Sequence, residues 1–456
     1  MDIHAKTIGF INNVCPHYSK YNYIDPAAYE NANLKRGLRN ADGTGVLAGI
    51  TRIGSVQGYD YRDGERIPAP GSLYYRGISV EKLIDGFAAE DRFGFEEVCY
   101  LLLFGKLPTA TELADFMDIM EQARNLPPNF TEDMILKAPS HDIMNKLARS
   151  ILVLYSSDPD PDGLSLPNIL RHSLELIARV PVIVAHAYAA KRHYFHDESL
   201  HIHWPRPGLS LAENFLHSLR PDNQFTREEA RLLDICMVLH AEHGGGNNSA
   251  FACRVLTSSH TDTFSAVSAA VGSLKGPRHG GANQKVMHMF ADIRQNLKDE
   301  TDDDEVEAYL EKLIHREAGD KSGLIYGMGH AVYTLSDPRA VVLKQHAKKL
   351  AAQRGLLDEF ALMEKVEALT PKVFARVKGD GKIISANVDM YSGLVYKMLG
   401  IPEELYTPIF AVARMAGWCA HRVEEIYSNG RIVRPAYRSV VQQADYIPMN
   451  QRTGEA

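Results

Sequence analysis

Apolar side chains recur at intervals of three and four residues along most of this 456-residue chain, as they do in helices that bury one face. The pattern is clear in the segments 141–155, 168–195, 209–219 and 227–241, which are separated by proline, glycine or aspartate. Pro181 lies inside the second segment and should kink or divide that helix. The spacing therefore predicts a mainly helical fold.

Strand-like sequence is confined to the stretch from Val46 to Tyr75, which has short β-branched and aromatic runs. Asp63-Gly64 divides this stretch and is typical of a hairpin turn. The first forty residues are polar and irregular, contain Pro16 and Pro26, and are expected to wrap around the body without forming a core. We therefore predict an all-α fold with a small antiparallel β element near the N-terminus.

Helix ends can be predicted from local signals. The apolar segment Phe95–Phe104 should be a helix that stops at Gly105 and before Pro108. Thr109 and Glu112 have the spacing of a capping box at the start of the next helix. One face of that helix would carry Leu113, Phe116, Met117 and Met120.

The acidic run Asp299–Glu307 could be mistaken for an interaction tail. Apolar residues follow it at helical spacing, namely Val306, Tyr309, Leu310, Leu313 and Ile314. Acidic side chains in the first turn of a helix complement the helix dipole. We therefore interpret the run as the beginning of an ordinary helix.

Composition indicates a globular protein, with 45% hydrophobic and 23% charged residues. The net charge of −7 argues against a general nucleic-acid binder but permits a local basic pocket for a small anion. The five cysteines are odd in number, far apart and without a CxxC pair, which favours reduced thiols. The N-terminus resembles no targeting peptide, and the run Val180–Ala190 is too short to span a bilayer. We expect a cytoplasmic protein without nucleic-acid or membrane partners.

The stretch from His240 to Gln284 carries two histidine sites bracketed by glycines. Phe264–Leu274 between them is rich in small apolar residues, which predicts a tightly packed buried helix. The glycines at 244–246 and 280–281 let the backbone approach another group closely. That group could be a neighbouring helix or a bound ligand, and the adjacent histidines favour the ligand.

Chemistry is suggested by six places in the sequence. They are His240-Ala-Glu242-His243, Arg278-His279-Gly280-Gly281, Gly327-Met-Gly329-His330, Asp337-Pro338-Arg339, Asn387-Val-Asp389, and the pair Arg414 and Arg434. Each is weak alone, because a histidine beside glycine is more often a core or capping residue. Arg414 is the most informative, since a charge within the apolar run AVARMAGW must be paired or must face a cavity.

Three common site types do not match these motifs. In HAEH the two histidines are three residues apart, whereas the zinc-protease pattern needs four, and glycines then end the helix. The segment from Gly276 to Gly281 lacks the Gly-Lys-Ser/Thr of a phosphate-binding loop. The chain also lacks the GxSxG elbow of a hydrolase. A zinc site with ligands from elsewhere remains an alternative.

Taken together, the motifs resemble those of the citrate synthase family. GPRHGGANQ, GMGHAVY followed by DPRA, NVDMYSG followed by GIP, and ARMAGWCAHRVEE occur in that family's order. The likeness extends upstream through FEEVCYLLLFGKLP, RVPVIVAHAY and LSLAENFLHSL, and thus spans residues 35–440. Tyr333-Thr334 departs from the pattern, because some relatives carry a basic residue there.

The resemblance implies a reaction and a domain organisation. The family condenses the methyl group of acetyl-CoA with the ketone of oxaloacetate and then hydrolyses the citryl thioester, a step of the tricarboxylic acid cycle. Residues 1–279 would begin a large helical domain, and 280–390 would form a small domain that closes over the active site. Residues 391–456 would complete the large domain and add a C-terminal arm.

Site residues follow by motif match. Asp389 would be the base, His279 would donate to the thioester oxygen, and His330 would polarise the ketone. Oxaloacetate or citrate would be held by His243, Asn247, Arg339, Arg414 and Arg434, the last from the neighbouring subunit of a homodimer. Coenzyme A would contact Leu324, Ile325, Tyr326, Gly327, Gly329 and Asn387. The resemblance implies no metal and no cofactor, with the coenzyme A thioester as substrate.

Two alternatives accompany this hypothesis. A 2-methylcitrate synthase would use the same residues on propionyl-CoA, since one methylene changes discrimination by only about 1–3 kcal/mol. In a different class, the chain could be a helical metal-binding or interaction protein in which the histidines are ligands or caps.

Overall fold

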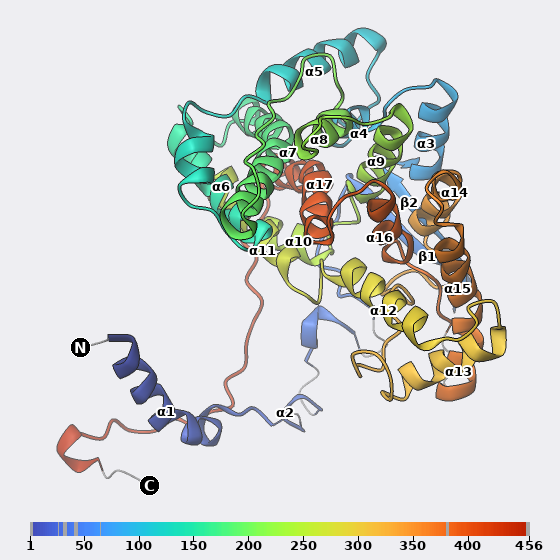
Figure 1. The fold of residues 1–456 in the computed structure, drawn as a ribbon. Coiled ribbons are helices and arrows are strands. Elements are labelled where there is room, and N and C mark those ends of the chain that lie inside the picture. The colour runs from blue at the N-terminus through green and yellow to red at the C-terminus, as the bar shows by residue number, and fades with distance from the viewer. Residues whose placement is uncertain are drawn as a thin grey trace. The chain divides into compact units, whose positions relative to one another are not determined.

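The computed structural model describes residues 3–25, 27–30, 34–40, 44–63, 65–379 and 383–452. The chain forms two compact units, Met1–Ile50 with Arg434–Ala456, and Thr51–Val433. The first unit contains helices α1 (Ile3–Asn22) and α2 (Ala27–Glu30) and the 3-10 turns η1 (Arg36–Leu38) and η5 (Met449–Gln451). The second unit holds the other elements that Figure 1 labels.

The expectation of an irregular N-terminus is wrong, because α1 is a 20-residue helix. Pro16 lies inside this helix. Proline removes one backbone hydrogen bond and disfavours a helix without forbidding it, so its presence was a poor guide. Pro26, which contributed to the same expectation, lies outside the described residues.

The sheet is a small antiparallel one, as predicted. Strands β1 (Gly54–Arg62), β2 (Glu65–Tyr75) and β3 (Ile78–Ser79) lie in that order. Arg62 pairs with Glu65, so two residues connect β1 to β2, and Asp63 has a φ of +53°. Gly64, the other half of the predicted turn, lies outside the described residues. Pairing begins at Gly54, eight residues later than the predicted start.

Helices make up most of the second unit. They are α3 (Val80–Ala89), α4 (Phe95–Phe104), α5 (Ala110–Ala123), the π-helix η2 (Thr131–Leu136), α6 (Ile143–Leu154), the 3-10 turn η3 (Tyr155–Ser157), α7 (Leu166–His196), α8 (Leu211–Leu219), α9 (Arg227–His240), α10 (Asn248–Thr257), α11 (Thr263–Lys275), α12 (Ala282–Asn296), α13 (Asp303–Ile314), α14 (Pro338–Gln353), α15 (Leu357–Lys378), α16 (Asp389–Met398), the 3-10 turn η4 (Glu403–Leu405) and α17 (Tyr406–Tyr427). The four helices predicted from apolar spacing are present, and Pro181 does not divide α7.

Local signals set several helix ends as predicted. Helix α4 ends at Gly105, whose φ is +83° and whose N–H donates to the carbonyl of Leu101. Thr109 and Glu112 form a complete capping box at α5. In α13 the Asp302 carboxylate accepts the N–H groups of the first turn, and the five apolar residues predicted to follow are buried. Short-range spacing is sufficient here because each cap involves atoms within four residues.

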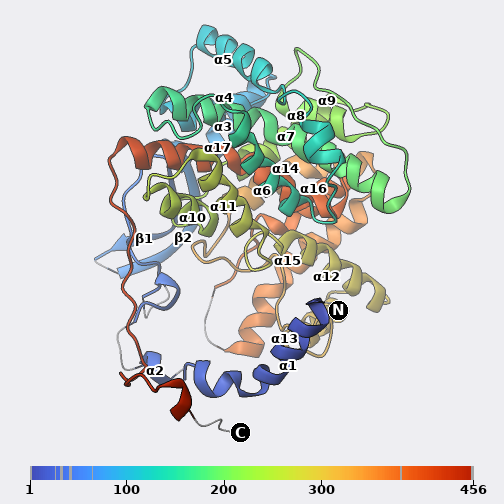
Figure 2. The same cartoon turned by 90° about the vertical axis from the view of Figure 1, so that its left-hand side faces the viewer.

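The core of the second unit is built around α17, which contacts α4, α7, α9, α10 and α11 (Figures 1 and 2). By length and composition α7 could cross a membrane, but 78% of its most apolar window is buried inside the structure. It packs against α5, α6, α8 and α17, which accounts for its apolar composition. The five cysteines are free, and all but Cys15 are buried.

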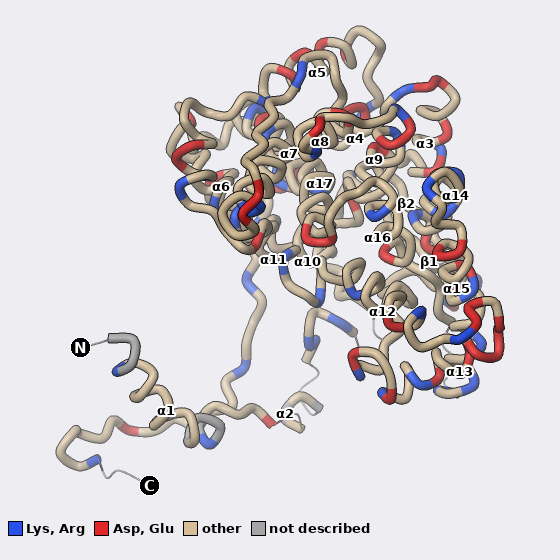
Figure 3. Tube along the Cα trace, viewed as in Figure 1, with Lys and Arg blue, Asp and Glu red and all other residues tan. Residues whose placement is uncertain are grey.

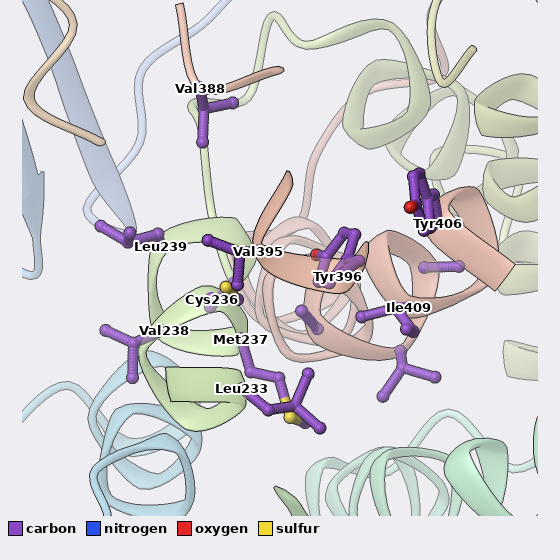
Figure 4. Packing of buried hydrophobic residues seen from close by; sticks show 14 of the residues in the cluster. Leu233, Cys236, Met237, Val238, Leu239, Val388, Val395, Tyr396, Tyr406 and Ile409 are labelled. Carbon is purple, nitrogen blue, oxygen red and sulfur yellow. The ribbon is translucent and has the colours of Figure 1, made fainter. Parts of the chain in front are cut away.

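Helix α9 packs against α16 and α17 beneath the segment that carries Asp389. Figure 4 shows Cys236 of α9 beside Val395 of α16, with Leu233 and Met237 further along the same buried layer. These side chains are nearly or completely buried. Because interiors are close-packed, this layer supports the second half of α16 and so holds the helix that begins at Asp389 rigidly in place.

Charged residues of both signs lie along the outer helices α13, α14 and α15 (Figure 3). Several form pairs that join these helices, such as Lys344 with Glu367 at 2.8 Å and Arg376 with Glu307 at 2.9 Å. The helices α12 to α15 fall within residues 280–390, and their assignment to a separate small domain stays a prediction.

Candidate active site

Apart from Arg414, the principal predicted site residues of the second unit lie at the ends of helices and in the turns between them. His243 follows α9, His279 lies between α11 and α12, His330 lies between α13 and α14, Arg339 is in the first turn of α14, Asp389 begins α16, and Arg414 lies within α17. Helix ends and turns leave side chains free to point towards a shared space.

Two loops are joined so that His330 lies near the start of α16. The N–H of Gly329 donates to the carbonyl of Ser385 at 2.7 Å, and the N–H of Asn387 donates to the carbonyl of Gly327 at 2.8 Å. The Asn387 amide also donates to the carbonyl of Gly329 at 2.8 Å. Gly327 has a φ of +81°, and a Cβ there would lie 3.0 Å from Met390 Cα. Glycine is therefore required for this approach.

His330 is held as a neutral imidazole with one donor. Its Nδ1 accepts the backbone N–H groups of Val332 at 3.0 Å and Tyr333 at 3.1 Å. An acceptor at Nδ1 assigns the ring proton to Nε2. Burial, and then the nearby Arg339 guanidinium, lower the pKa of His330 to about 4. Near neutral pH, His330 thus offers one N–H donor and does not ionise.

His279 is held in the opposite tautomer. Its Nε2 accepts the N–H of Ser249 at 3.3 Å and lies 3.0 Å from that residue's hydroxyl oxygen. The buried Trp418 donates to the same hydroxyl at 3.1 Å. The ring proton is therefore assigned to Nδ1. Burial, and then the Arg414 guanidinium, lower the pKa of His279 to about 4.

The carboxylate of Asp389 accepts no hydrogen bond from the described part of the chain, whereas the Asp389 N–H donates to Asn387 Oδ1 at 3.0 Å. Burial raises the pKa of Asp389 to about 6; the Arg339 charge opposes this shift and the Asp337 charge adds to it. An unpaired carboxylate with such a pKa is ionised at neutral pH and remains a usable proton acceptor.

Arg339 is fixed by a buried ion pair. Its Nε and Nη2 donate to the two oxygens of Asp337 at 3.0 and 2.7 Å. The same carboxylate also accepts the N–H of Val388 at 3.3 Å, which links α14 to the segment before Asp389. Burial alone would lower the pKa of Arg339, but the Asp337 charge raises it, so the guanidinium stays charged.

Arg414 is fully buried and only partly satisfied. Its Nε donates to the carbonyl of His240 at 2.6 Å. Its Nη1 and Nη2 atoms have no partner among the described residues. Burial lowers the pKa of Arg414 to about 10, so it remains charged at neutral pH. A buried cation with two unused donors is costly unless an anion occupies the adjacent space.

His243 lies between the arginines and His330. Its ring centroid is 5.2 Å from that of His330, and its Nε2 is 3.2 Å from the Tyr333 hydroxyl. Burial, then the charge of Arg339, lower its pKa well below the usual value. Asn247 Oδ1 accepts the Ser249 hydroxyl proton at 2.9 Å. The arginines, the three histidines and Asp389 thus form one polar cluster.

The residues predicted to contact coenzyme A divide into two groups. Leu324, Ile325 and Gly329 line a cavity of about 400 Å³ together with His330 and with side chains from α15. Tyr326, Gly327 and Asn387 belong to the same loops but do not line this cavity. The Tyr326 hydroxyl donates to Asp320 at 2.6 Å and lies 3.2 Å from Lys285 Nζ.

Arg434 is exposed and belongs to the other unit, so it is not among the side chains that the second unit assembles. Among the described residues, no group of three or more His, Cys, Asp and Glu side chains could hold a metal ion. His240 and Glu242 of the HAEH motif are buried instead, and Glu242 accepts from the His421 ring at 2.9 Å.

Sequence reasoning missed several residues that hold the site together. The resemblance gave Asp337 no role, although its position two residues before Arg339 is a usable signal for an ion pair. Ser249 and Trp418, which fix His279, come from segments far from it along the chain. Nothing in their spacing indicates the contact.

Comparison with known proteins decides the family. Residues 40–436 match the model of the citrate synthase C-terminal domain. A citrate synthase of Synechocystis is 34% identical over 429 residues, which cover 93% of this chain and 95% of the relative. The chain belongs to the citrate synthase family. It is therefore an acyltransferase.

Other comparisons agree with this membership. The 2-methylcitrate synthase 1 of Corynebacterium glutamicum is 30% identical, covering 92% of this chain and 99% of the relative. The citrate synthase of Thermoplasma acidophilum, solved as a ternary complex with carboxymethyl coenzyme A and oxaloacetate, superposes with a TM-score of 0.75. It is 27% identical, with 92% of this chain and 99% of that chain covered. The predicted helical fold is thus confirmed as that of the citrate synthases.

Proposed function

We propose that the chain condenses acetyl-CoA with oxaloacetate and hydrolyses the citryl-CoA formed, releasing citrate and coenzyme A, as in the tricarboxylic acid cycle. One observation carries the proposal: two neutral histidines in opposite tautomers share a buried cluster, through the charges of Arg339 and Arg414, with a carboxylate that no described group hydrogen-bonds. Such a set provides one proton acceptor and two donors for carbonyl oxygens, which is what enolisation followed by addition requires.

Each step then has a residue. Asp389 takes a proton from the acetyl methyl group while His279 Nδ1–H donates to the thioester oxygen, stabilising the enol. The methyl carbon then bonds to the oxaloacetate ketone carbon. The ketone oxygen takes the Nε2 proton of His330, and the proton that Asp389 removed replaces it, so that no proton is gained or lost overall. Water then cleaves the thioester bond, giving a carboxylate and a free thiol.

Binding of oxaloacetate would use the cations of the same cluster. Arg414 has two unused donors and Arg339 is held in place by Asp337, so both suit carboxylates. His243 and Asn247 would complete this pocket. Coenzyme A would enter along the cavity at Leu324 and Ile325, which His330 also lines. Closure of residues 280–390 over residues 1–279 and 391–456 would exclude water before condensation.

The relative named 2-methylcitrate synthase 1 supports a second candidate, the same reaction with propionyl-CoA. The test is thiol release from acetyl-CoA and from propionyl-CoA, each with oxaloacetate. We expect kcat/KM to favour acetyl-CoA by roughly 10- to 200-fold, since one methylene is worth about 1–3 kcal/mol. Preference for propionyl-CoA would establish the second candidate, and no thiol release from either would overturn both. Addition of EDTA should change nothing, because no metal or cofactor is part of the proposal.

We also propose a cytoplasmic homodimer in which Arg434 completes the partner's site. Mixing and refolding Asp389→Asn with Arg434→Leu protomers tests this. Each variant alone should be inactive, whereas one of the two sites in a mixed dimer would carry both native residues. Random pairing should then restore about a quarter of wild-type activity. No recovery would place Arg434 in the site of its own subunit, and an Arg434→Leu variant that is active alone would place it outside any site.

A further inference from the structure

Tyr333 makes contacts with three members of the site, although the proposed chemistry gives it no role. Its ring stacks on His330 with centroids 4.6 Å apart and planes 28° apart. Its hydroxyl lies 3.2 Å from His243 Nε2. The Arg339 guanidinium lies 5.8 Å from the ring centroid. Only 2% of Tyr333 is exposed, so the residue is fixed within the cluster.

The hydroxyl of Tyr333 can set the tautomer of His243. Burial raises the pKa of Tyr333 far above its usual value, so the phenol keeps its proton. Among the described residues its one hydrogen-bond partner is His243 Nε2. A buried phenol O–H that donates there makes Nε2 an acceptor, which places the ring proton of His243 on Nδ1. His243 then has a single fixed donor.

The backbone of Tyr333 acts on the second histidine. Its N–H donates to His330 Nδ1 at 3.1 Å, beside the N–H of Val332 at 3.0 Å. This places the His330 proton on Nε2, the reverse of the arrangement in His243. Stacking with the Tyr333 ring fixes the plane in which that proton points.

The β1–β2 hairpin packs closely against the segment around Tyr333 at two glycines. A Cβ on Gly71 would lie 2.5 Å from the Tyr333 ring and 2.2 Å from the Ser336 carbonyl oxygen. A Cβ on Gly58 would lie 2.9 Å from Tyr333 Cα. The hydroxyl of Thr334 donates to the carbonyl of Gly58 at 2.8 Å. The sheet thus supports the loop at a distance that only glycine permits.

We propose that Tyr333 is a positioning residue that fixes opposite tautomers in His243 and His330, with the β1–β2 hairpin as its support. The inference rests on the proposed function, in which His243 binds oxaloacetate and His330 polarises its ketone. The side-chain hydroxyl of Tyr333 governs oxaloacetate binding through His243. The ring and backbone of Tyr333 govern turnover through His330.

The test separates these two effects. Tyr333→Phe keeps the ring and the backbone and removes only the hydroxyl. We expect the calorimetric Kd and the KM of oxaloacetate to rise roughly 3- to 10-fold, the loss of one neutral hydrogen bond, while kcat changes less than about 3-fold. Tyr333→Leu also removes the stack, and kcat should then fall by a further factor of roughly 10. A merely structural role would not raise the KM of oxaloacetate in Tyr333→Phe while leaving kcat nearly unchanged.

Tyr309→Phe is the matched control, because its hydroxyl donates to Asp292 at 2.6 Å and the residue is 7% exposed. It should lower Tm without changing oxaloacetate affinity. The ring nitrogens of ¹⁵N-labelled histidine give a readout that needs no turnover. The His243 signals, identified by their loss in His243→Asn, should show Nδ1–H in the wild type and a tautomer mixture in Tyr333→Phe.

Three results would overturn the inference: an Nε2–H tautomer of His243 in the wild type, an unaltered tautomer in Tyr333→Phe, or unaltered oxaloacetate affinity in that variant. An inactive wild type would instead count against the proposed function, since the nitrogen spectra still report on Tyr333.

Discussion

Replacing Asp389 by asparagine is expected to lower kcat for thiol release by roughly 10²- to 10⁴-fold, the usual contribution of a general base. Asparagine keeps the size of the side chain but cannot accept the methyl proton. Because the carboxylate is not assigned to oxaloacetate binding, the calorimetric Kd of oxaloacetate should stay within about 3-fold of the wild-type value. Steady-state kinetics and calorimetry on the same preparations measure both.

The pH dependence gives an independent check on Asp389. Burial raises its pKa to about 6, so the carboxylate is protonated below that value and cannot act as the base. We expect kcat/KM of the wild type to fall about tenfold per pH unit below pH 6. The much lower kcat/KM of Asp389→Asn should not show this fall, which is the acid limb of the pH profile. Activity that survives the substitution, or an acid limb that persists in the variant, would assign the base to another group.

The same shift has a consequence for stability. A carboxyl whose pKa is raised in the folded state binds its proton more tightly there than in the unfolded chain. Its contribution therefore becomes less favourable as the pH rises from about 4 to about 6 and stays so above it. Asp389→Asn should consequently raise Tm at pH 7.5 while it removes activity, which a general loss of folding would not do.

Replacing Arg414 by methionine is expected to abolish useful affinity for oxaloacetate without harming the unliganded protein. Loss of a buried charge that pairs with a carboxylate typically costs about 2–5 kcal/mol. That corresponds to an increase in Kd of roughly 30- to 4,000-fold. In the unliganded protein, however, Arg414 is fully buried and its Nη atoms have no described partner. Methionine of similar length removes a buried charge with two unpaired donors but also its attraction to Glu242, so Tm should stay close to the wild-type value.

Arg422 of the same helix is the matched control. It is also fully buried, but its guanidinium donates to the hydroxyls of Thr257 and Thr263 at 3.2 and 3.0 Å and to the carbonyl of Thr261 at 2.7 Å. Arg422→Met leaves these acceptors without donors and should lower stability by about 1–3 kcal/mol. Its oxaloacetate affinity should change little. Thermal denaturation and calorimetry distinguish the two variants. A fall in Tm for Arg414→Met with no fall for Arg422→Met would contradict the assignment of Arg414 to oxaloacetate binding.

Much of the fold could be predicted because its signals are local. Three helix ends depend on atoms within a few residues: the capping box at Thr109, the helix stop at Gly105, and the start of α13 at Asp302, where the first turn is acidic. Where a local signal was ambiguous the prediction failed. Pro16 suggested irregular chain in a segment that forms α1, and Pro181, which was expected to kink or divide α7, does not divide it. Proline lowers the preference for helix, and neighbouring residues decide the outcome.

The sequence alone determined which residues could take part: the motifs identified His279, His330, Asp389, Arg339 and Arg414, and with them the family. The tertiary structure decided what each can do. The tautomers of the histidines follow from N–H groups and hydroxyls of Ser249, Val332 and Tyr333, and the raised pKa of Asp389 follows from burial. Protonation state and donor direction depend on the dielectric environment and on partners that distant segments supply, and no spacing along the chain encodes them.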